Sequence, residues 1–358
     1  MIHWQRLLLA RPALAVLGAL AVISATGESG AAEAQAPAVS MPAETADFPA
    51  VYSRTIGNVS VLQVRPDVYL LTAGQINTVL QTGPDGAIVV DPGPAAGAEQ
   101  MLQAIRAVTS APIRYIINTS ADPELTGANA TISAAGYSLL TNQRGRVAPI
   151  LMRQNALLSL LSSEDSKSSA STLVVNAFDR QEFSFFFNGQ AVHIIGQPAA
   201  YSSADAVVQF QRSDVVVTGR IFDDTAFPVI NRSAGGSLQG EIDALNGLIN
   251  GVVTASVPII GKPAGSWQQA PAVASLVIPV RGPLTDQQDL ANYRDMVMTV
   301  QARVADLVRQ RKSEAQVQAE NPLQGFETRY TNGGSEAGAA FVKAVYLSLK
   351  TPSAGGRP

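Results

Sequence analysis

The stretch from residue 115 to residue 129 reads Tyr115-Ile-Ile-Asn-Thr-Ser-Ala-Asp-Pro-Glu-Leu-Thr-Gly-Ala-Asn129. Its first residues complete an apolar run at 113–117 that predicts a buried strand. Short polar residues follow, and the stretch ends in a Gly-Ala-Asn turn. Because α/β proteins place their chemistry in loops at the carboxyl ends of strands, we expect this loop to belong to a functional site.

The residues before this stretch predict a βαβ unit. Residues 77–82 and 87–90 form a predicted hairpin, and Asp91-Pro92-Gly93 ends its second strand. Residues 98–108 then carry apolar side chains at helical spacing and lead into the strand at 113–117.

The rest of the chain alternates predicted strands and helices. Asn188-Gly189 between two apolar runs is the strongest hairpin signal. Further strands are predicted at 59–64, 68–71, 138–140, 183–187, 191–195, 206–210, 215–218 and 257–260. Helices are predicted at 147–161 and 237–248 and in the tail, where Thr285-x-x-Gln288 and Ser313-x-x-Gln316 resemble capping boxes. This order predicts an α/β (α+β) fold, a four-layer αββα sandwich with a C-terminal helical extension.

The composition is that of a folded protein with an ordinary charge. Of 358 residues, 46% are hydrophobic and 15% are charged, which is enough apolar residue for a large core. The net charge of −3 gives no sign of a nucleic-acid partner. The sequence has no Cys and two His, which excludes thiol nucleophiles and Cys-ligated zinc.

The amino-terminal residues are typical of a secretory signal. Arg6 and Arg11 precede an apolar run, and Ala32-Glu33-Ala34 suits cleavage, so we expect residues 1–34 to be removed. The apolar run is shorter than the ~20 residues that span a bilayer, which favours cleavage over a retained anchor. We therefore predict a periplasmic or secreted protein with no membrane span after cleavage. Residues 35–48 are predicted to be a disordered linker, residues 49–280 the main domain, and residues 281–350 helices packed on or beside it.

Several short segments, taken in order, resemble the metallo-β-lactamase superfamily over roughly residues 58–265. Asn118-Thr119 and Gly127-Ala128-Asn129 are similar to the flanks of its first metal motif. Other similar segments are residues 86–93 (Gly-Ala-Ile-Val-Val-Asp-Pro-Gly), 196–205, 218–222 and 260–263. The resemblance implies the family's αββα fold and a zinc-dependent hydrolase, in which the metal lowers the pKa of a bound water.

The positions that hold metal in the family carry other residues here. After the Asn-Thr pair the family reads His-x-His-x-Asp-His, where this chain has Ser120, Asp122, Glu124 and Leu125. Tyr201 stands at the third His, Arg220 at the bridging Asp and Lys262 at the last His. The one His outside the signal, His193, lies in a predicted strand, so a zinc cofactor is not expected.

Two cations at former ligand positions suggest what replaces the metal. We predict that Arg220 and Lys262 point into the cleft and face Asp122 and Glu124. Such opposed charges would keep the cleft folded without a metal, because a buried charge needs a partner.

Other roles for these residues remain open. Asp122 and Glu124, with Asp91 and Asp205, would suit a hard cation such as Mg²⁺ or Ca²⁺. The favoured interpretation is that Asp122 and Glu124 cap the following turn and that Asp91 fixes a turn. Ser120 would be a nucleophile with Lys262 as base, or a small residue that fills space. Tyr201 would act as an acid, stack on a ligand, or fill the room that imidazole and metal leave.

The sequence therefore predicts the fold of a hydrolase family, with a degenerate metal site in which other residues replace the usual ligands. The favoured function is a non-catalytic binding or accessory protein, with a small molecule or a periplasmic protein in the family's active-site cleft. The alternative is a hydrolase that uses an oxygen-ligand metal on Asp122, Glu124 and Asp205, or a metal-free acid–base site of Glu124, Tyr201 and Lys262. A third hypothesis is a scaffold whose helical tail is the contact face.

Overall fold

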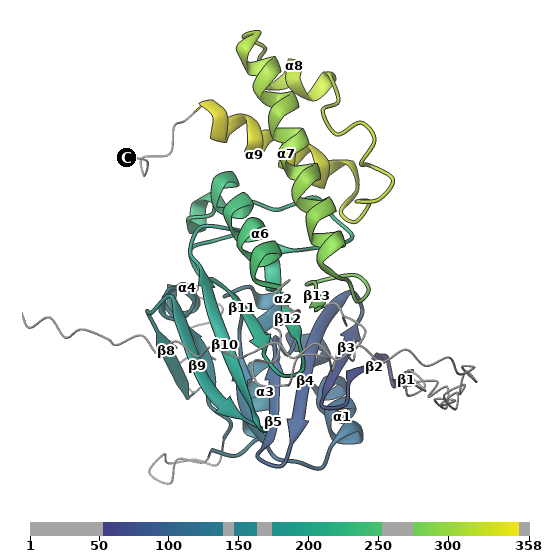
Figure 1. Ribbon diagram of the computed structural model, residues 1–358, viewed down its shortest axis with the longest axis vertical. Coiled ribbons are helices and arrows are strands. Elements are labelled where there is room, and N and C mark those ends of the chain that lie inside the picture. The colour runs from purple at the N-terminus through teal and green to yellow at the C-terminus, as the bar shows by residue number, and fades with distance from the viewer. Residues whose placement is uncertain (1–52, 139–146, 163–173, 253–274, 351–358) are drawn as a thin grey trace, which may run out of the picture. The chain divides into compact units, whose positions relative to one another are not determined.

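An eight-stranded sheet, sheet A, is built from the first half of the chain, and its strands lie in chain order (Figure 1). The computed structural model describes residues 53–138, 147–162, 174–252 and 275–350. Pairing is antiparallel from β1 to β5 and parallel from β5 to β8. The strands are β1 Ser53–Ile56, β2 Val59–Arg65, β3 Val68–Ala73, β4 Ile76–Gly83, β5 Gly86–Val90, β6 Ile113–Ile117, β7 Ile150–Arg153 and β8 Val175–Phe178.

A five-stranded sheet, sheet B, follows in the order β13-β12-β11-β10-β9. All its pairs are antiparallel except β12 with β13. The β9–β10 hairpin turns at Asn188 and Gly189, both at positive φ (50° and 75°), as the Asn-Gly pair predicts. The strands are β9 Glu182–Phe187, β10 Gln190–Gln197, β11 Asp205–Phe210, β12 Val215–Val217 and β13 Leu276–Ile278.

Helices lie between these strands and form the tail. The α-helices are α1 Ala98–Val108, α2 Pro123–Thr126, α3 Asn129–Ala134, α4 Gln154–Ser162, α6 Leu238–Val252, α7 Gln287–Arg309, α8 Glu314–Ala319 and α9 Gly334–Lys350. Short 3-10 helices are η1 Ala95–Gly97, η2 Gly219–Ile221 and η3 Arg232–Ala234.

Three apolar clusters show that these elements form four layers. Neighbouring strand residues point to opposite faces, so Ile116 packs toward α1, α3 and α4, whereas Ile117 packs between the two sheets. In sheet B, Val208 faces sheet A and Val207 faces α6 and the tail helices. This order of helices, sheet, sheet and helices confirms the predicted αββα sandwich.

The tail helices pack in one apolar cluster with α6 and with the outer face of sheet B. Leu290, Tyr293, Val300 and Val304 form the buried stripe of α7 and pack with residues of α6, α8 and α9. Ser313 and Gln316 form the predicted capping box of α8. The box of α7 is one residue later than predicted: Asp286 is the N-cap and Asp289 completes it, while Thr285 bridges to Val277. The domain boundary at residues 280 and 281 stays a prediction.

One predicted helix is partly wrong. The spacing at residues 147–161 predicts a helix, but Ile150–Arg153 form a strand and the helix begins only at Gln154. All four residues of β7 are buried in a parallel part of the sheet, and a continuous apolar run of this kind does not distinguish strand from helix. The strands β1, β8 and β13 were not predicted. The strand predicted at 257–260 lies outside the described residues, as do residues 139 and 140 of the strand predicted at 138–140.

Within the described ranges, no helix has the length and apolar character that crossing a membrane requires.

Candidate functional site

Loops that follow five strands meet at one end of the sandwich. Asp91 follows β5 and residues 118–124 follow β6. Tyr201 follows β10, Arg220 follows β12, and Arg281 follows β13. These strands run in the same direction within their sheets, so their carboxyl ends bring the loops together, which is the usual place for a site in such folds.

Asp91 is a buried carboxyl group that ties two of these loops together. It is 2% exposed, adopts a positive φ of 51°, and accepts hydrogen bonds from the backbone N–H (2.8 Å) and hydroxyl (2.6 Å) of Thr119. Burial raises the pKa of Asp91 to about 7, against the opposing effect of the Thr119 hydrogen bonds. The role predicted as a turn residue agrees with this geometry.

The loop after β6 is organised by its own short polar side chains. Asp122 is the N-cap of α2, where its carboxylate accepts from the N–H of Glu124 at 2.9 Å and Pro123 begins the helix. Ser120 is buried, and its hydroxyl accepts from the N–H of Asp122 at 3.1 Å. Leu125 is fully buried against Ile76 and Val280.

Arg220 lies between the two acids of this loop. Its Nη2 is 2.7 Å from Oδ2 of Asp122 and also bonds to the carboxylate of Glu124. Arg281 bonds to the same oxygen of Glu124, and its other nitrogen lies 2.9 Å from Oδ2 of Asp223. We call these five residues the rim cluster. Except for Glu124, which is half exposed, their side chains are at most 17% exposed.

The charges of the rim cluster stabilise one another. Burial by itself would raise the pKa of Glu124, but Arg220 and Arg281 outweigh it and hold this pKa below its usual value. Burial would likewise lower the pKa of Arg220, and Asp122 and Glu124 reverse that effect. Both groups are therefore held in their charged forms.

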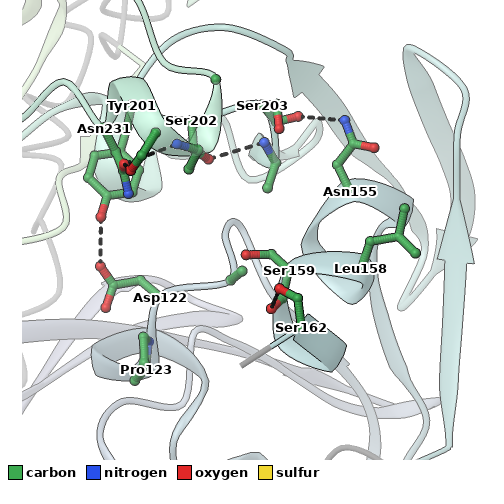
Figure 2. Close-up of a pocket in the computed structure, with 15 residues that line it drawn as sticks. Asp122, Pro123, Asn155, Leu158, Ser159, Ser162, Tyr201, Ser202, Ser203 and Asn231 are labelled. Carbon is green, nitrogen blue, oxygen red and sulfur yellow. Dashed lines mark hydrogen bonds between the residues drawn. The ribbon is translucent and has the colours of Figure 1, made fainter. Parts of the chain in front are cut away.

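Tyr201 closes the rim cluster on one side. Its hydroxyl donates to Oδ2 of Asp122 at 3.3 Å (Figure 2). Its ring centroid lies 5.8 Å from the guanidinium carbon of Arg220. Burial, followed by the charge of Asp122, raises the pKa of Tyr201. The phenol is thus a neutral donor held against the ion pair.

A second charged group lies deeper in the protein. Asp205 is 1% exposed and accepts from the N–H (2.6 Å) and hydroxyl (2.8 Å) of Ser202; burial raises its pKa to about 7. Arg153 and Glu241 interact electrostatically with Asp205 and are 8% and 1% exposed. Nε and Nη1 of Arg153 and Oε2 of Glu241 have no hydrogen-bond partner within the described ranges. We call these three residues the inner cluster.

The sequence predicted part of this arrangement. The expected pairing of Arg220 with Asp122 and Glu124 is present. Lys262, the expected second cation, lies outside the described residues, and Arg281 was not predicted at all. Along the sequence, most of sheet B lies between the loop after β6 and Arg281. The parallel pairing of β12 with β13 brings Arg281 close to Arg220 in space.

The remaining candidate residues lie apart from the rim cluster. His193, which lies in a predicted strand, is half-buried on β10, where it bonds to Glu182 and Ser184. Asp205 belongs to the inner cluster and caps its own turn.

Comparison with known families identifies the fold. The model of the Metallo-beta-lactamase superfamily matches residues 71–135, which include β4, β5, α1, β6 and the loop that carries Asp122 and Glu124. Over these residues the chain is similar to the metallo-β-lactamase superfamily. No curated protein gives a significant match to the whole sequence.

Solved structures of a sulfatase share this architecture. A stereoselective inverting sec-alkylsulfatase from Pseudomonas sp., Pisa1, is 12% identical and superposes with a TM-score of 0.59, and a double mutant of that sulfatase gives 0.58. Each match covers 83% of this chain and 51% of the sulfatase, so the chain spans about half the length of those proteins. A metallo-β-lactamase from Pontibacter korlensis is 14% identical, with 70% of this chain and 99% of that chain covered, at a TM-score of 0.48. At these identities the likeness shows the fold alone.

The described residues at the superfamily's metal-ligand positions do not fit a metal ion. Leu125 is part of an apolar cluster, and Ser120 accepts a backbone hydrogen bond. Asp122 and Glu124 already bind the guanidinium of Arg220, whose positive charge would repel a divalent ion. Among the residues that the structure describes, no three of His, Cys, Asp or Glu are grouped to hold one.

A cavity of about 580 Å³ opens beside the rim cluster (Figure 2). Asp122 and Tyr201 line one side of it, and Asn155, Leu158 and Ser159 of α4 line another. The loops at 201–204 and 231–235 complete the wall. The sequence did not predict the residues of α4 and of the loop at 231–235, because nothing local marks them as part of a cavity.

Proposed function

We propose that this protein is an exported binding or accessory protein, and that its cleft takes a small molecule or another protein without metal-dependent hydrolysis. The observation that carries the proposal is the position of Arg220 between Asp122 and Glu124. A fixed cation there supplies the charge that a metal ion supplies in the catalytic members.

The chemistry of the superfamily supports this proposal. A metal activates water by withdrawing charge from a bound oxygen, which requires an open coordination position. A guanidinium has only N–H donors and no coordination position, so it cannot bind a water oxygen as a metal ion does. The rim cluster therefore stabilises the loop after β6 but does not generate hydroxide.

Export is supported by the signal pattern in residues 1–34, which include the Arg-flanked apolar run and the Ala-x-Ala site. Mass spectrometry of the protein recovered from the periplasm or medium would give the mature amino terminus. A protein that keeps residues 1–34 in the cytosol would contradict the proposed location.

Metal analysis tests the central claim. We expect protein purified without chelator to contain no stoichiometric zinc, manganese or iron, and zinc titration to produce no heat of binding. An Arg220→Asp variant, which replaces the guanidinium by a third carboxylate, is expected to gain affinity for Mn²⁺ or Ca²⁺. Wild-type protein that binds one of these metals at least as tightly as the variant would overturn the proposal.

An activity panel tests the alternative, a hydrolase with an oxygen-ligand metal or with a metal-free site of Glu124, Tyr201 and Lys262. Suitable substrates are a β-lactam, a thioester, a phosphodiester and a sec-alkyl sulfate, the last because the sulfatase shares the fold. We expect no turnover above that of an Asp122→Asn, Glu124→Gln double variant. Turnover that this double variant abolishes would establish the alternative.

A further inference from the structure

The wall of the cavity beside the rim cluster is polar but carries little charge. Its described lining includes five serines, Tyr201 and the amides of Asn155 and Asn231, and no Lys or Arg among the described lining residues. Its one charged side chain in the described ranges, Asp122, is bound by Arg220 at 2.7 Å, by the N–H of Glu124 and by the hydroxyl of Tyr201. An anionic ligand would find no cation in this part of the wall, and a cationic ligand would compete with Arg220 for Asp122.

Several polar groups in this wall are available to a ligand. Asn155 donates one amide hydrogen to the carbonyl of Ser203 at 3.1 Å. The side-chain oxygen of Asn155 and the hydroxyls of Ser159 and Ser203 have no hydrogen-bond partner among the described residues. Figure 2 shows these side chains around one opening, and Asn231 and Tyr201 lie on its other side. Hydroxyls and amides both donate and accept, so they match a ligand that does the same.

The cavity also has apolar surface. Leu158 of α4 is 56% exposed at its edge, and Ala121, Pro123 and Ala204 lie in the wall. The volume of about 580 Å³ falls in the range of ~300–1,000 Å³ that is common for small-molecule sites. Alternating hydroxyl and C–H surface is the character of a sugar ring, which presents both to such a wall.

We infer that this cavity binds an uncharged polyhydroxylated ligand, a short neutral oligosaccharide. The inference rests on the proposed function and names the ligand class of the same cleft. Asn155, Ser159 and Ser203 contact the sugar hydroxyls, and Leu158 contacts the C–H face of a ring. The rim cluster keeps Asp122 neutralised and fixes the position of Tyr201.

Trisaccharides that differ in charge test the inference. We would titrate the full chain with maltotriose, cellotriose and N,N′,N″-triacetylchitotriose, which are neutral, with trigalacturonate, which is anionic, and with the glucosamine trimer, which is cationic. Saturation-transfer NMR and calorimetry would report binding. We expect at least one neutral trisaccharide to bind about tenfold more tightly than both charged ones.

Two variants locate the site. Asn155→Ala should weaken the neutral trisaccharide about tenfold, because it removes a donor and an acceptor from the wall. Asn176→Ala is the matched control, since Asn176 is exposed on β8 and does not line the cavity, and it should leave affinity unchanged. Absence of binding by every neutral trisaccharide, tighter binding of a charged one, or unchanged affinity in Asn155→Ala would overturn the inference. Hydrolysis of a bound trisaccharide would instead contradict the proposed function and leave the ligand class intact.

Discussion

The rim cluster and the inner cluster are both groups of ionisable side chains, but they stabilise their charges in different ways. In the rim cluster each charged group has an opposite charge within hydrogen-bonding distance, although Nε of Arg220 has no hydrogen-bond partner among the described residues. In the inner cluster, as far as the structure describes the chain, Arg153 and Glu241 keep polar atoms without a partner, and the carboxylate of Asp205 bonds to Ser202. Burial raises the pKa of Asp205 to about 7 and that of Glu241 well above its usual value.

This difference shows two solutions to the same physical problem. An ionisable group that is removed from water either pairs with a close counter-charge or becomes neutral; a carboxyl group becomes neutral by keeping its proton. The rim cluster uses the first solution and stays ionised, whereas the carboxyl groups of the inner cluster favour the second. Asp122, Glu124 and Arg220, which stand at metal-ligand positions of the superfamily, thus lie in a network of opposite charges.

The largest expected effect is that of breaking the rim cluster. Arg220→Ala leaves Asp122, whose side chain is 12% exposed, without its cation, so the free energy of unfolding should fall by ~3–5 kcal/mol. Urea denaturation at neutral pH measures this. Arg309→Ala is the control, because its pair with Asp306 has side chains that are 73% and 57% exposed, and it should change stability by at most ~0.5 kcal/mol. Equal effects of the two substitutions would show that the rim cluster contributes no more than a surface pair.

A smaller effect is expected from crowding the inner cluster. Gly196 on β10 lies against Arg153, and a Cβ at that position would overlap Nη1 of the guanidinium. Gly196→Ala should therefore cost ~1–3 kcal/mol of stability. In an Arg153→Met background the same substitution should cost clearly less, since the shorter thioether side chain leaves room. A cost that is the same in both backgrounds would mean that Arg153 does not occupy this space.

A third expected effect, which develops over a range of pH, distinguishes the two clusters. Because the pKa of Asp205 is raised from 3.8 to about 7, the folded protein keeps a proton that the unfolded chain has lost. Its contribution to stability is fully present below pH 3.8 and is lost as the pH rises through about 7. Glu124, whose pKa is lowered, contributes in the opposite sense, since its stabilisation is lost as the pH falls.

Asp205→Asn tests this difference, because the amide can still accept from the N–H of Ser202 without titrating. Between pH 3.8 and about 7, the unfolding free energy of the wild type should fall more steeply than that of the variant, by up to ~1.4 kcal/mol per pH unit. Thermal or urea unfolding at several pH values gives the slopes. Parallel curves for the two proteins would contradict a raised pKa at Asp205.

Local patterns predicted most of the fold correctly. The helix Ala98–Val108 and the strand Ile113–Ile117 have the predicted bounds, and Asn188-Gly189 forms the predicted turn. These elements depend on the period of apolar residues and on backbone preferences, which a short sequence window contains. The strand Ile150–Arg153 was missed because its burial on both faces removes the alternation that marks a strand.

The site was less predictable than the fold. Ser120, Asp122, Glu124, Tyr201 and Arg220 were found because the family's motifs place them, and the structure brings the acids to Arg220. Arg281, Arg153 and Glu241 belong to no motif. Their roles follow from strand pairing and from burial, which a sequence window does not contain.

By itself the sequence determined the αββα sandwich and the loop after β6, because these depend on the order and type of residues along the chain. Only the tertiary structure decided that Arg281 shares Glu124 with Arg220, that burial raises the pKa values of the acids of the inner cluster, and that α4 faces the loop of Tyr201 across a cavity. Charges and cavities act through space, and the distances that set them exist only once the two sheets have packed.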